Sequence, residues 1–316
     1  MTDRLHIGKY RVIRTIGNGG MSIVYEVESP NSEHFALKLF TSDGKHADFL
    51  RKRFIAEGKI LSRLTEPHLV KVHEIGIDPE TGAPYFTMDL VLDSNGNPCT
   101  LENLRRIGGL KEERVLAIYT DLRAALIHLH RNGIVHRDIK LENVLINAEG
   151  RPILSDFGVS RIFNNELRKE IAVTTTFAAD RAPIMGSAGY LSPELKSSKA
   201  ATPADDAWAL GVLVFRLLTG VWYEENSSAM DLIAGFDPCW EELLATLLNS
   251  DPAQRLPLPE VSSTKNARRS KTKRYVKFAA ICAGALTIIA LICARLSAPS
   301  YEFDEFFPPI QETKTE

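Results

Sequence analysis

The sequence changes character near residue 92, and this change limits the folds that the chain can adopt. Before it, short runs rich in β-branched and aromatic residues surround a glycine cluster and are interrupted by one helical pattern at residues 48–64. The runs that predict strands are residues 10–16, 23–27, 35–40 and 85–91. After about residue 100, helical spacing predicts helices at residues 115–130, 206–218 and 241–248. The sequence therefore predicts an α+β fold with a strand-rich part followed by a helix-rich part.

The overall charge of the chain conceals large differences between its segments. The 316 residues contain 38 Lys and Arg against 40 Asp and Glu, for a net charge of −2. Residues 1–262 carry a net charge of −6, residues 263–296 carry +8, and residues 297–316 carry −4. The composition, 44% apolar and 25% charged, is that of a globular protein and excludes a disordered tail, a collagen or a disulfide mini-protein. The four cysteines are far apart in sequence and predict neither a zinc site nor a disulfide framework.

An uncharged stretch near the C-terminus predicts one transmembrane helix at residues 278–294. It is apolar apart from Thr287, and a spanning helix needs about 17–25 such residues. Lys277 and Arg295 at its ends could extend the span by snorkelling. Basic residues concentrate on the N-terminal flank, so we expect residues 1–277 to be cytoplasmic in a single-pass protein of the cell membrane. The alternative is a buried core helix, which would ordinarily show a polar face.

The segments on either side of this stretch have the composition expected beside a membrane helix. Residues 258–277 are predicted to be a basic juxtamembrane linker that attracts anionic lipid. A nucleic-acid patch is the alternative, and we disfavour it because the apolar span follows directly, so no nucleic-acid partner is expected. Residues 295–316 form a short acidic, extracytoplasmic tail, too short to fold as a sensor domain. Ala280 and Gly284 have the spacing of paired membrane helices, which leaves a homodimer open.

A glycine cluster between two predicted strands indicates a phosphate-covering turn. Residues 17–22 read Gly-Asn-Gly-Gly-Met-Ser, and a strand rather than a helix follows, so the dinucleotide-binding motif does not fit. Glycines let the backbone approach phosphates closely, although an ordinary tight hairpin would have the same pattern. In the next strand Lys38 is surrounded by apolar residues, where a cation is costly unless it is paired. Glu57 in the following helix is the expected partner.

Further motifs follow in a fixed order along the chain. They are His136-Arg137-Asp138-Ile139-Lys140-Leu141-Glu142-Asn143, Asp156-Phe157-Gly158, Pro193-Glu194, the run from Asp206 to Gly211, and Arg255. Together with the glycine turn and Lys38, this set resembles the eukaryotic-type (Hanks-type) serine/threonine protein kinase family in its bacterial branch. The resemblance covers residues 8–257. It implies a two-lobed protein kinase fold with a small β-rich N-lobe at residues 8–91 and a mainly helical C-lobe at residues 92–257.

The resemblance implies a binding site for ATP. Gly17, Gly19 and Ser22 would cover its phosphates; the third position is usually glycine, so Ser22 is a departure. Lys38 would hold the α- and β-phosphates, and Glu57 would hold Lys38. The adenine would lie between Val24, Ala36 and Leu145, beside Met88 as gatekeeper and against the backbone of Asp89 and Val91.

The resemblance also implies the catalytic residues. Asp138 would orient the substrate hydroxyl and accept its proton, and Lys140 would neutralise charge on the transferred phosphoryl group. Asn143 and Asp156 would bind Mg²⁺, with Mn²⁺ as an alternative, because amide and carboxylate oxygens suit a hard cation. Lys140 and Ser187 are the residues that indicate serine/threonine rather than tyrosine specificity.

Other positions are expected to support the site. We expect an ion pair between Arg255 and Glu194. We also expect Asp206 to brace residues 136–143, which we call the catalytic loop. Two substitutions, Leu141 for the usual proline and Ser192 for the usual alanine, are expected to be tolerated. A packed stack is expected from Leu61, Val72, His136 and Phe157.

The segment from Asp156 to Glu194, which the resemblance identifies as the activation segment, is expected to regulate activity. Because an arginine, Arg137, precedes Asp138, we expect autophosphorylation in this segment, at one or more of Thr174, Thr175 and Thr176. The alternative is that these are ordinary solvated loop threonines. Residues 220–255 are shorter than the corresponding region of relatives, which puts substrate choice in doubt more than catalysis.

The leading hypothesis is therefore a membrane-anchored, ATP-dependent kinase that phosphorylates serine and threonine hydroxyls of protein substrates. A pseudokinase scaffold at the membrane is the first alternative, and the intact set Lys38, Asp138, Asn143 and Asp156 argues against it. A small-molecule kinase of similar fold is the second alternative. The activation segment and Pro193-Glu194 argue against that reading.

Overall fold

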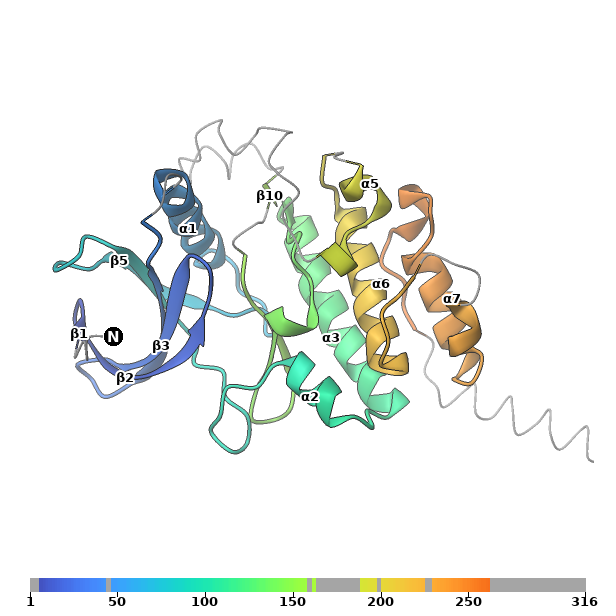
Figure 1. Ribbon diagram of the computed structural model, residues 1–316, viewed down its shortest axis with the longest axis horizontal. Coiled ribbons are helices and arrows are strands. Elements are labelled where there is room, and N and C mark those ends of the chain that lie inside the picture. Colours follow the sequence, from blue (N-terminus) through green and yellow to red (C-terminus); the bar gives the residue numbers. More distant parts are fainter. Residues whose placement is uncertain are drawn as a thin grey trace, which may run out of the picture. The chain divides into compact units, whose positions relative to one another are not determined.

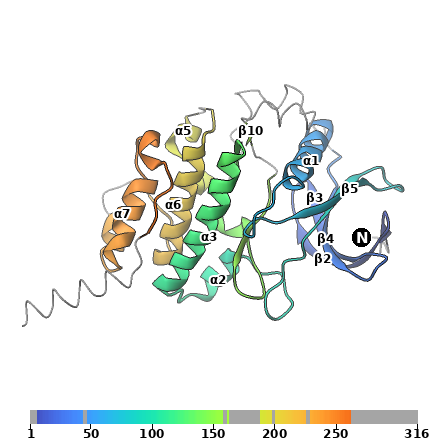
Figure 2. The same ribbon diagram turned by 180° about the vertical axis from the view of Figure 1, so that it is seen from behind.

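The computed structural model describes residues 6–43, 47–157, 161–162, 188–197, 200–224 and 229–261. All of them belong to one compact unit that spans residues 1–262. Within this unit a sheet-rich lobe precedes a larger helical lobe, as Figures 1 and 2 show from two sides. The two-lobed α+β architecture expected from the sequence is confirmed.

The small lobe is built on an antiparallel sheet of six strands in the order β1-β2-β3-β4-β6-β5. The strands are β1 (His6–Ile7), β2 (Tyr10–Asn18), β3 (Ser22–Glu28), β4 (His34–Phe40), β5 (Val72–Ile77) and β6 (Pro84–Met88). Val, Ile, Phe and Tyr recur in them because such side chains suit a pleated, half-buried surface. The inner strands β4 and β6 are buried along almost their whole length.

One helix, α1 (Ala47–Leu61), packs against β5 and β6 of this sheet. The ring of Phe54 lies 4.9 Å from that of Phe86 and 5.7 Å from that of Phe40, centroid to centroid. Residues three apart on a helix share a face, so Glu57 is buried with Phe54 against the sheet. The packing of α1 thereby places a carboxylate inside the lobe.

The large lobe is centred on α6 (Pro203–Thr219), which lies between α3 (Glu112–Arg131) and α7 (Pro238–Leu247) (Figures 1 and 2). Most residues of α6 are buried, as a helix that is apolar on all sides requires. A Cβ atom at Gly211 would lie 2.9 Å from the Leu247 Cβ, so glycine allows α6 and α7 to approach closely.

Shorter elements complete this lobe. They are α2 (Leu101–Ile107), β7 (Ile134–Val135), the 3₁₀ turn Leu141–Asn143, β8 (Val144–Ile146), β9 (Pro152–Leu154), β10 (Arg161–Ile162) and α5 (Pro193–Lys196). The loop between β7 and β8 carries the first motif of the C-lobe, and Asp156 follows β9. The Val70 N–H donates to the Leu154 carbonyl over 3.0 Å, which ties the connection leading to β5 to β9.

Three differences from the sequence expectations have a visible cause. The strand predicted at residues 85–91 ends at Met88, because the Asp89 N–H donates to the Lys71 carbonyl instead of extending the ladder with β4. The helix predicted at residues 48–64 ends at Leu61 in a tighter turn, in which the Leu64 N–H bonds to the Leu61 carbonyl. The sequence did not predict β5, whose register shift after Val72 breaks the expected alternation.

No helix among the described residues is long and apolar enough to cross a membrane. The predicted span at residues 278–294, most of the basic linker and the acidic tail lie outside the described residues. Thr174, Thr175, Thr176 and Ser187 also lie outside them.

Candidate active site

The register of the small sheet brings the predicted nucleotide-binding residues onto one face. Gly17 on β2 pairs with Val24 on β3, and Val24 pairs with Lys38 on β4. Ala36, two residues before Lys38 and therefore on the same face, pairs with Met88 on β6. Antiparallel partners point to the same side of a sheet, so all five positions line one surface.

The glycine turn closes over the end of this surface. The Gly19 N–H donates to the Ser22 carbonyl over 2.9 Å, which makes a tight turn between β2 and β3. A Cβ atom at Gly20 would meet nothing within 4 Å, so the tip of the turn is open. Ser22, where a third glycine was usual, is buried at the start of β3. Its side chain therefore does not obstruct the tip.

A buried lysine connects the small lobe to the segment after β9. The Lys38 Nζ atom lies 2.7 Å from Glu57 Oε1 and 3.2 Å from Asp156 Oδ1. The Phe157 N–H also donates to Glu57 Oε1, over 3.3 Å. The predicted pair of Lys38 and Glu57 is present in the structure, and it includes Asp156 as a third member.

Burial and charge act in opposite directions on this cluster. Burial alone would lower the pKa of Lys38, but Glu57 and Asp156 outweigh it and raise the pKa. Burial raises the pKa of the Glu57 carboxyl, although Lys38 opposes this shift. Glu57 Oε2 is buried and has no hydrogen-bond partner among the described residues. Two carboxylates thus share one ammonium, so this cluster has an excess of negative charge in the absence of a cation.

The loop between β7 and β8 holds a second cluster of polar groups. The Lys140 Nζ atom lies 2.7 Å from Asp138 Oδ2. The Asn143 amide nitrogen donates to the same oxygen over 2.9 Å and to the Asp138 carbonyl over 2.8 Å. These contacts fix the Asp138 carboxylate and direct the Asn143 amide oxygen away from it.

Asp206 braces this loop from the start of α6, as the sequence predicts. Its carboxylate accepts backbone hydrogen bonds of 2.9 Å from His136 and from Arg137, and it lies 2.8 Å from His130 Nε2. Arg137 has a φ of 72° and Asp156 a φ of 64°, in the left-handed region that non-glycine residues seldom adopt. Such conformations cost about 1–3 kcal/mol each and persist where surrounding contacts enforce them, which is common at functional sites.

The end of β6 exposes backbone groups beside the shared face of the small sheet. The Asp89 N–H is used by Lys71, but no described residue donates to the Asp89 carbonyl or bonds to the backbone of Val91. Leu145, on β8 opposite Ile153, is half-buried against the main core. A planar heterocycle with a donor and an acceptor on one edge would find matching backbone groups here.

The donor set beside Asp138 suits a magnesium ion. The Asn143 amide oxygen and the half-exposed Asp156 carboxylate are hard oxygen donors. No cluster of three or more His, Cys, Asp or Glu able to hold a metal occurs within the described ranges. That is compatible with Mg²⁺, which commonly takes only one or two protein ligands and completes its shell with phosphate oxygens and water.

The predicted supporting contacts of the large lobe are also present. Arg255 is fully buried and makes two hydrogen bonds of 3.0 Å to the Glu194 carboxylate. Ser192 caps α5 by accepting from the Leu195 N–H over 3.2 Å, and its hydroxyl also donates to Asp205. The serine that replaces the usual alanine is thus accommodated by two hydrogen bonds.

One contact of the expected stack is present, between His136 and Phe157. The rings of His136 and Phe157 lie 4.5 Å apart, centroid to centroid. Phe157, Leu61 and Val72 belong to the same buried core cluster. Burial lowers the pKa of His136 despite the nearby carboxylate of Asp206. A neutral, packed imidazole agrees with a structural role for this histidine.

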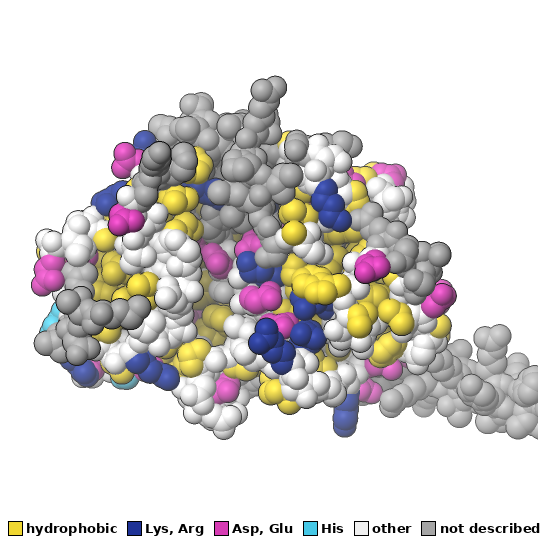
Figure 3. Space-filling model, viewed as in Figure 1, with side chains coloured by type: hydrophobic (Ala, Val, Ile, Leu, Met, Phe, Trp, Pro, Cys, Tyr) yellow, Lys and Arg dark blue, Asp and Glu magenta, His cyan; other side chains and the backbone are white. Residues whose placement is uncertain are grey.

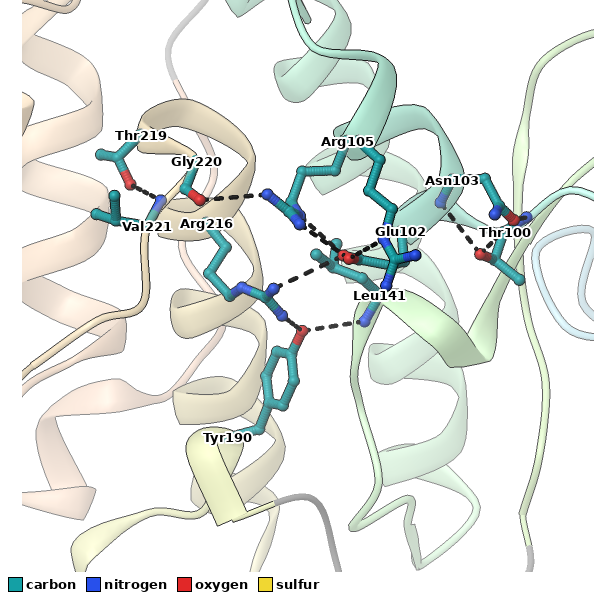
Figure 4. A network of polar contacts seen from close by, with 11 residues as sticks. Thr100, Glu102, Asn103, Arg105, Leu141, Tyr190, Arg216, Thr219, Gly220 and Val221 are labelled. Carbon is teal, nitrogen blue, oxygen red and sulfur yellow. Dashed lines mark hydrogen bonds and ion pairs between the residues drawn. The ribbon is translucent and has the colours of Figure 1, made fainter.

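Two basic residues of interest were not singled out from the sequence. Arg53 is buried on α1, and burial followed by repulsion from Arg137 lowers its pKa. It precedes Glu57 by one helical turn, and this spacing could have identified it from the sequence. Arg216 is buried in α6 and joins a polar network with Tyr190 and Glu102 (Figure 4). A lone cation in an otherwise apolar helical pattern was the signal there.

Comparison with known proteins places these motifs in a family. The model of the family described as "Protein kinase domain" matches residues 10–265. The chain is 32% identical over 227 residues to serine/threonine-protein kinase PrkC of Bacillus subtilis, which covers 71% of this chain and 32% of that protein. It is 29% identical over 265 residues to serine/threonine-protein kinase PknD of Mycobacterium tuberculosis, covering 78% of this chain and 38% of that protein.

A third relative gives the same picture. Serine/threonine-protein kinase PknH of Mycobacterium bovis is 31% identical over 229 residues, covering 72% of this chain and 36% of that protein. The chain therefore spans between about a third and two fifths of the length of these curated relatives.

Proposed function

The chain belongs to the bacterial branch of the eukaryotic-type serine/threonine protein kinase family, and on this premise we propose that it transfers the γ-phosphoryl group of ATP to serine and threonine hydroxyls of proteins. The observation that carries the proposal is the proximity of two polar clusters, connected by a 2.9 Å hydrogen bond from the Ser155 N–H to the Asn143 carbonyl. Lys38, Glu57 and Asp156 form one, and Asp138, Lys140 and Asn143 form the other. Both follow the order and spacing of the family motifs.

The nucleotide would bind on the shared face of the small sheet. Val24, Ala36 and Leu145 offer apolar surface to the adenine, beside Met88, while the carbonyl of Asp89 and the backbone of Val91 offer hydrogen bonds to its edge. The backbone of the turn at Gly17, Gly19 and Ser22 would cover the phosphates, because close approach of main-chain N–H groups favours anions. Lys38 is already oriented by Glu57 at 2.7 Å and would hold the inner phosphates.

Magnesium would be held by Asn143 and Asp156. The bound cation supplies charge neutralisation for the phosphates, and it would replace the present interaction between Asp156 and Lys38 as the partner of that carboxylate. Mn²⁺, a second hard cation, is expected to substitute.

The acceptor hydroxyl would be positioned by the loop between β7 and β8. Asp138 is held by Asn143 at 2.9 Å and would orient the hydroxyl and accept its proton. Lys140, 2.7 Å from the same carboxylate, would stabilise charge on the transferred group. Positioning and electrostatic stabilisation dominate phosphoryl transfer, and these residues are built for both.

Regulation by phosphorylation of the activation segment is part of the proposal. Arg53 and Arg137 lie close enough for their charges to repel, and a phosphate between them would relieve that repulsion. Thr174, Thr175 and Thr176 are the proposed autophosphorylation sites. Phosphopeptide mapping after incubation with ATP and Mg²⁺ should find phosphate on at least one of the three, and its absence there would overturn this part.

The sequence supports attachment to a membrane. We propose a kinase domain at residues 8–257, a basic linker at 258–277, a spanning helix at 278–294 and an acidic tail at 295–316 on the far side. The basic linker would bind anionic lipid headgroups at about 1 kcal/mol per basic residue near the surface. Flotation of the full chain with liposomes, compared with a chain ending at residue 262, tests this part separately from catalysis.

One assay separates kinase activity from a pseudokinase scaffold. The full chain is incubated with ATP, Mg²⁺ and a generic protein substrate, and labelled protein is measured. Asp138→Asn should reduce the rate by about 10²–10⁴-fold, because it removes the base that faces the hydroxyl. Lys38→Ala should also abolish most activity. Asp231→Asn and Lys111→Ala, at exposed positions outside the site, are matched controls and should retain wild-type rates.

The outcomes discriminate the alternatives. A wild-type rate equal to that of Asp138→Asn would favour the scaffold. Transfer of label to a small alcohol but not to protein would favour a small-molecule kinase.

A further inference from the structure

Three arginines surround one glutamate at the junction of α2 and α6. Arg105 Nε and Nη2 each donate to the Glu102 carboxylate over 2.8 Å, and Arg106 Nε donates to it over 2.9 Å. The Arg216 Nη2 atom lies 3.7 Å from the same carboxylate. Figure 4 shows Arg105 and Arg216 pointing toward Glu102 from the two helices. We call Glu102, Arg105, Arg106 and Arg216 the arginine cluster.

The arginine cluster has an excess of positive charge. Hydrogen bonds from Arg105, aided by those from Arg106, lower the pKa of Glu102 to about 2, so this carboxylate is ionised at neutral pH. One negative charge therefore faces three guanidinium groups. Figure 3 shows Lys and Arg side chains gathered over α2, next to acidic and hydrophobic side chains on the same face. A group with this charge balance attracts anions.

Arg216 is the most buried arginine of the arginine cluster. Its side chain is 6% exposed, and Nη1 donates to the uncharged Tyr190 hydroxyl over 2.5 Å. Its Nε is buried and has no hydrogen-bond partner among the described residues. A guanidinium carries five donors, so a buried one with so few partners is unusual. Its charge therefore acts on the surface from beneath the cluster rather than by direct contact with a ligand.

An exposed aromatic residue forms one wall of the same area. The guanidinium carbon of Arg216 lies 3.6 Å from the ring centroid of Trp222, which is 49% exposed. A Cβ atom at Gly189 would lie 2.4 Å from this ring, so only glycine allows Trp222 to rest here. Val221 beside it is 48% exposed. Exposed tryptophan next to arginine is typical of surfaces that bind peptides.

The arginine cluster is directly connected to the catalytic loop. The Tyr190 hydroxyl that binds Arg216 also accepts from the Leu141 N–H over 3.3 Å (Figure 4). Leu141 follows Lys140. Two hydrogen bonds and one peptide unit therefore separate Arg216 Nη1 from the Lys140 Cα, a distance of at most about 9 Å. An extended peptide covers this distance in about three residues.

We propose that the arginine cluster and Trp222 form a subsite of the kinase that selects protein substrates with an anionic side chain, a carboxylate or a phosphate, within about four residues of the acceptor hydroxyl. The proposal rests on the kinase function proposed above. Arginine forks suit both groups, and the cluster's net charge favours a doubly charged phosphate over a carboxylate. Arg105 and Arg106 would contact the anion, and Arg216 would contribute charge beneath it.

Glu142 sets the limit on this preference. It belongs to the same loop as Lys140. The hydrogen bonds to Glu102 raise the pKa of Arg105 and burial raises the pKa of Tyr190, and Glu142 is close enough to add to both shifts. Including Glu142, the subsite keeps one net positive charge. Selectivity should therefore be moderate, and it should fall as salt screens the exposed part of the interaction.

The test uses the full chain and a set of peptides with one threonine acceptor in a neutral background. Each flanking position, up to four residues on either side, carries phosphoserine, aspartate, asparagine or lysine in turn. At the best position, kcat/KM is expected to fall in the order phosphoserine, aspartate, asparagine, lysine. The kcat/KM values of the phosphoserine and asparagine peptides should differ by about tenfold or more, which is the effect of one charged hydrogen bond.

A charge reversal separates recognition from general damage. Arg106 is 70% exposed, so Arg106→Glu should fold normally. It should lower kcat/KM for the phosphoserine peptide by about tenfold and raise it for the lysine peptide, which loss of structure could not do. Arg131→Glu is the matched control, because this exposed arginine lies at the far end of α3, about 28 Å from the helix start. It should leave the order of peptides unchanged.

Binding of a fluorescent phosphoserine peptide, followed by anisotropy, keeps the test independent of catalysis. If no peptide is phosphorylated above the Asp138→Asn background, the kinase function fails, and peptide binding that Arg106→Glu abolishes still supports the subsite. If peptides are phosphorylated with equal kcat/KM, the kinase function stands and the subsite is overturned. A preference for anions that Arg106→Glu leaves intact would also overturn it.

Discussion

Lys38 in the small lobe and Arg255 in the large lobe are both buried cations paired with a glutamate, yet they are neutralised to different degrees. Arg255 makes two hydrogen bonds of 3.0 Å to Glu194 and a third of 2.7 Å to the Asn249 carbonyl. Its guanidinium carbon also lies 4.8 Å from the Trp208 ring centroid. Every face of this arginine has a partner within the protein.

The lysine cluster is unbalanced by comparison. Lys38 bonds to both Glu57 and Asp156, and Glu57 Oε2 has no partner among the described residues. Two carboxylates with one ammonium leave a net negative charge, which the proposed cation would balance. The difference suggests two uses of buried charge in this protein: a complete set of partners holds the fold, and an incomplete set coincides with the ligand site proposed above.

The largest expected effect is on stability, at Arg255. Arg255→Met should lower the free energy of unfolding by about 3–5 kcal/mol, because it leaves the Glu194 carboxylate without its partner. Urea denaturation followed by tryptophan fluorescence measures this loss. Adding Glu194→Gln to the same chain should recover part of it. A loss below about 1 kcal/mol would show that this pair does not hold the large lobe together.

The second prediction is that a change at Lys38 affects activity more than stability. Lys38→Met should reduce phosphoryl transfer by about 10²–10³-fold, the cost of removing one charged group that stabilises a transition state. Its effect on the free energy of unfolding should be smaller than that of Arg255→Met, because Glu57 can take up a proton and Asp156 is half-exposed. The comparison would break if Lys38→Met destabilised the protein more than Arg255→Met.

The third prediction concerns Ser192, two residues before Glu194. Ser192→Ala should lower the free energy of unfolding by about 1 kcal/mol, because the hydroxyl caps α5 and donates to Asp205. Catalytic rate should not change. The conservative variant Ser192→Thr should lose less stability if the hydroxyl is what matters, and equal losses would assign the effect to packing instead.

The smallest effects are on the pH dependence of stability, and they have opposite signs at the two glutamates. Burial would raise the pKa of Glu194, but hydrogen bonds from Arg255 outweigh it and hold the pKa below 4.5. The contribution of Glu194 to the free energy of unfolding is fully present above pH 4.5. It is lost as the pH falls through the lower pKa that Glu194 has in the folded state. Burial raises the pKa of Glu57, so its contribution is greatest below pH 4.5 and is lost as the pH rises through the folded value.

These signs can be measured with two glutamine variants. The stability gained between about pH 3.5 and about pH 7 should shrink in Glu194→Gln and grow in Glu57→Gln, relative to the wild type. Urea denaturation at the two pH values gives both differences. A change of the same sign in both variants would contradict the distinction between the two pairs.

Much of this organisation could be predicted from the sequence, because it depends on local pattern and motif order. The pairs of Lys38 with Glu57 and of Arg255 with Glu194, and the brace from Asp206, were predicted and are present. The end of β6 at Met88 was placed three residues too late, because apolar residues continue past the point where the ladder stops.

What the sequence determined by itself is the succession of elements and the chemical groups of the cleft, because periodicity and local motifs act within a few residues. Only the tertiary structure decided which distant groups share an environment. Arg216 meets Glu102 because α2 and α6 converge, and Asp156 reaches Lys38 because the two lobes are held together. These contacts join residues more than 100 positions apart, where chain packing rather than local propensity sets the distance.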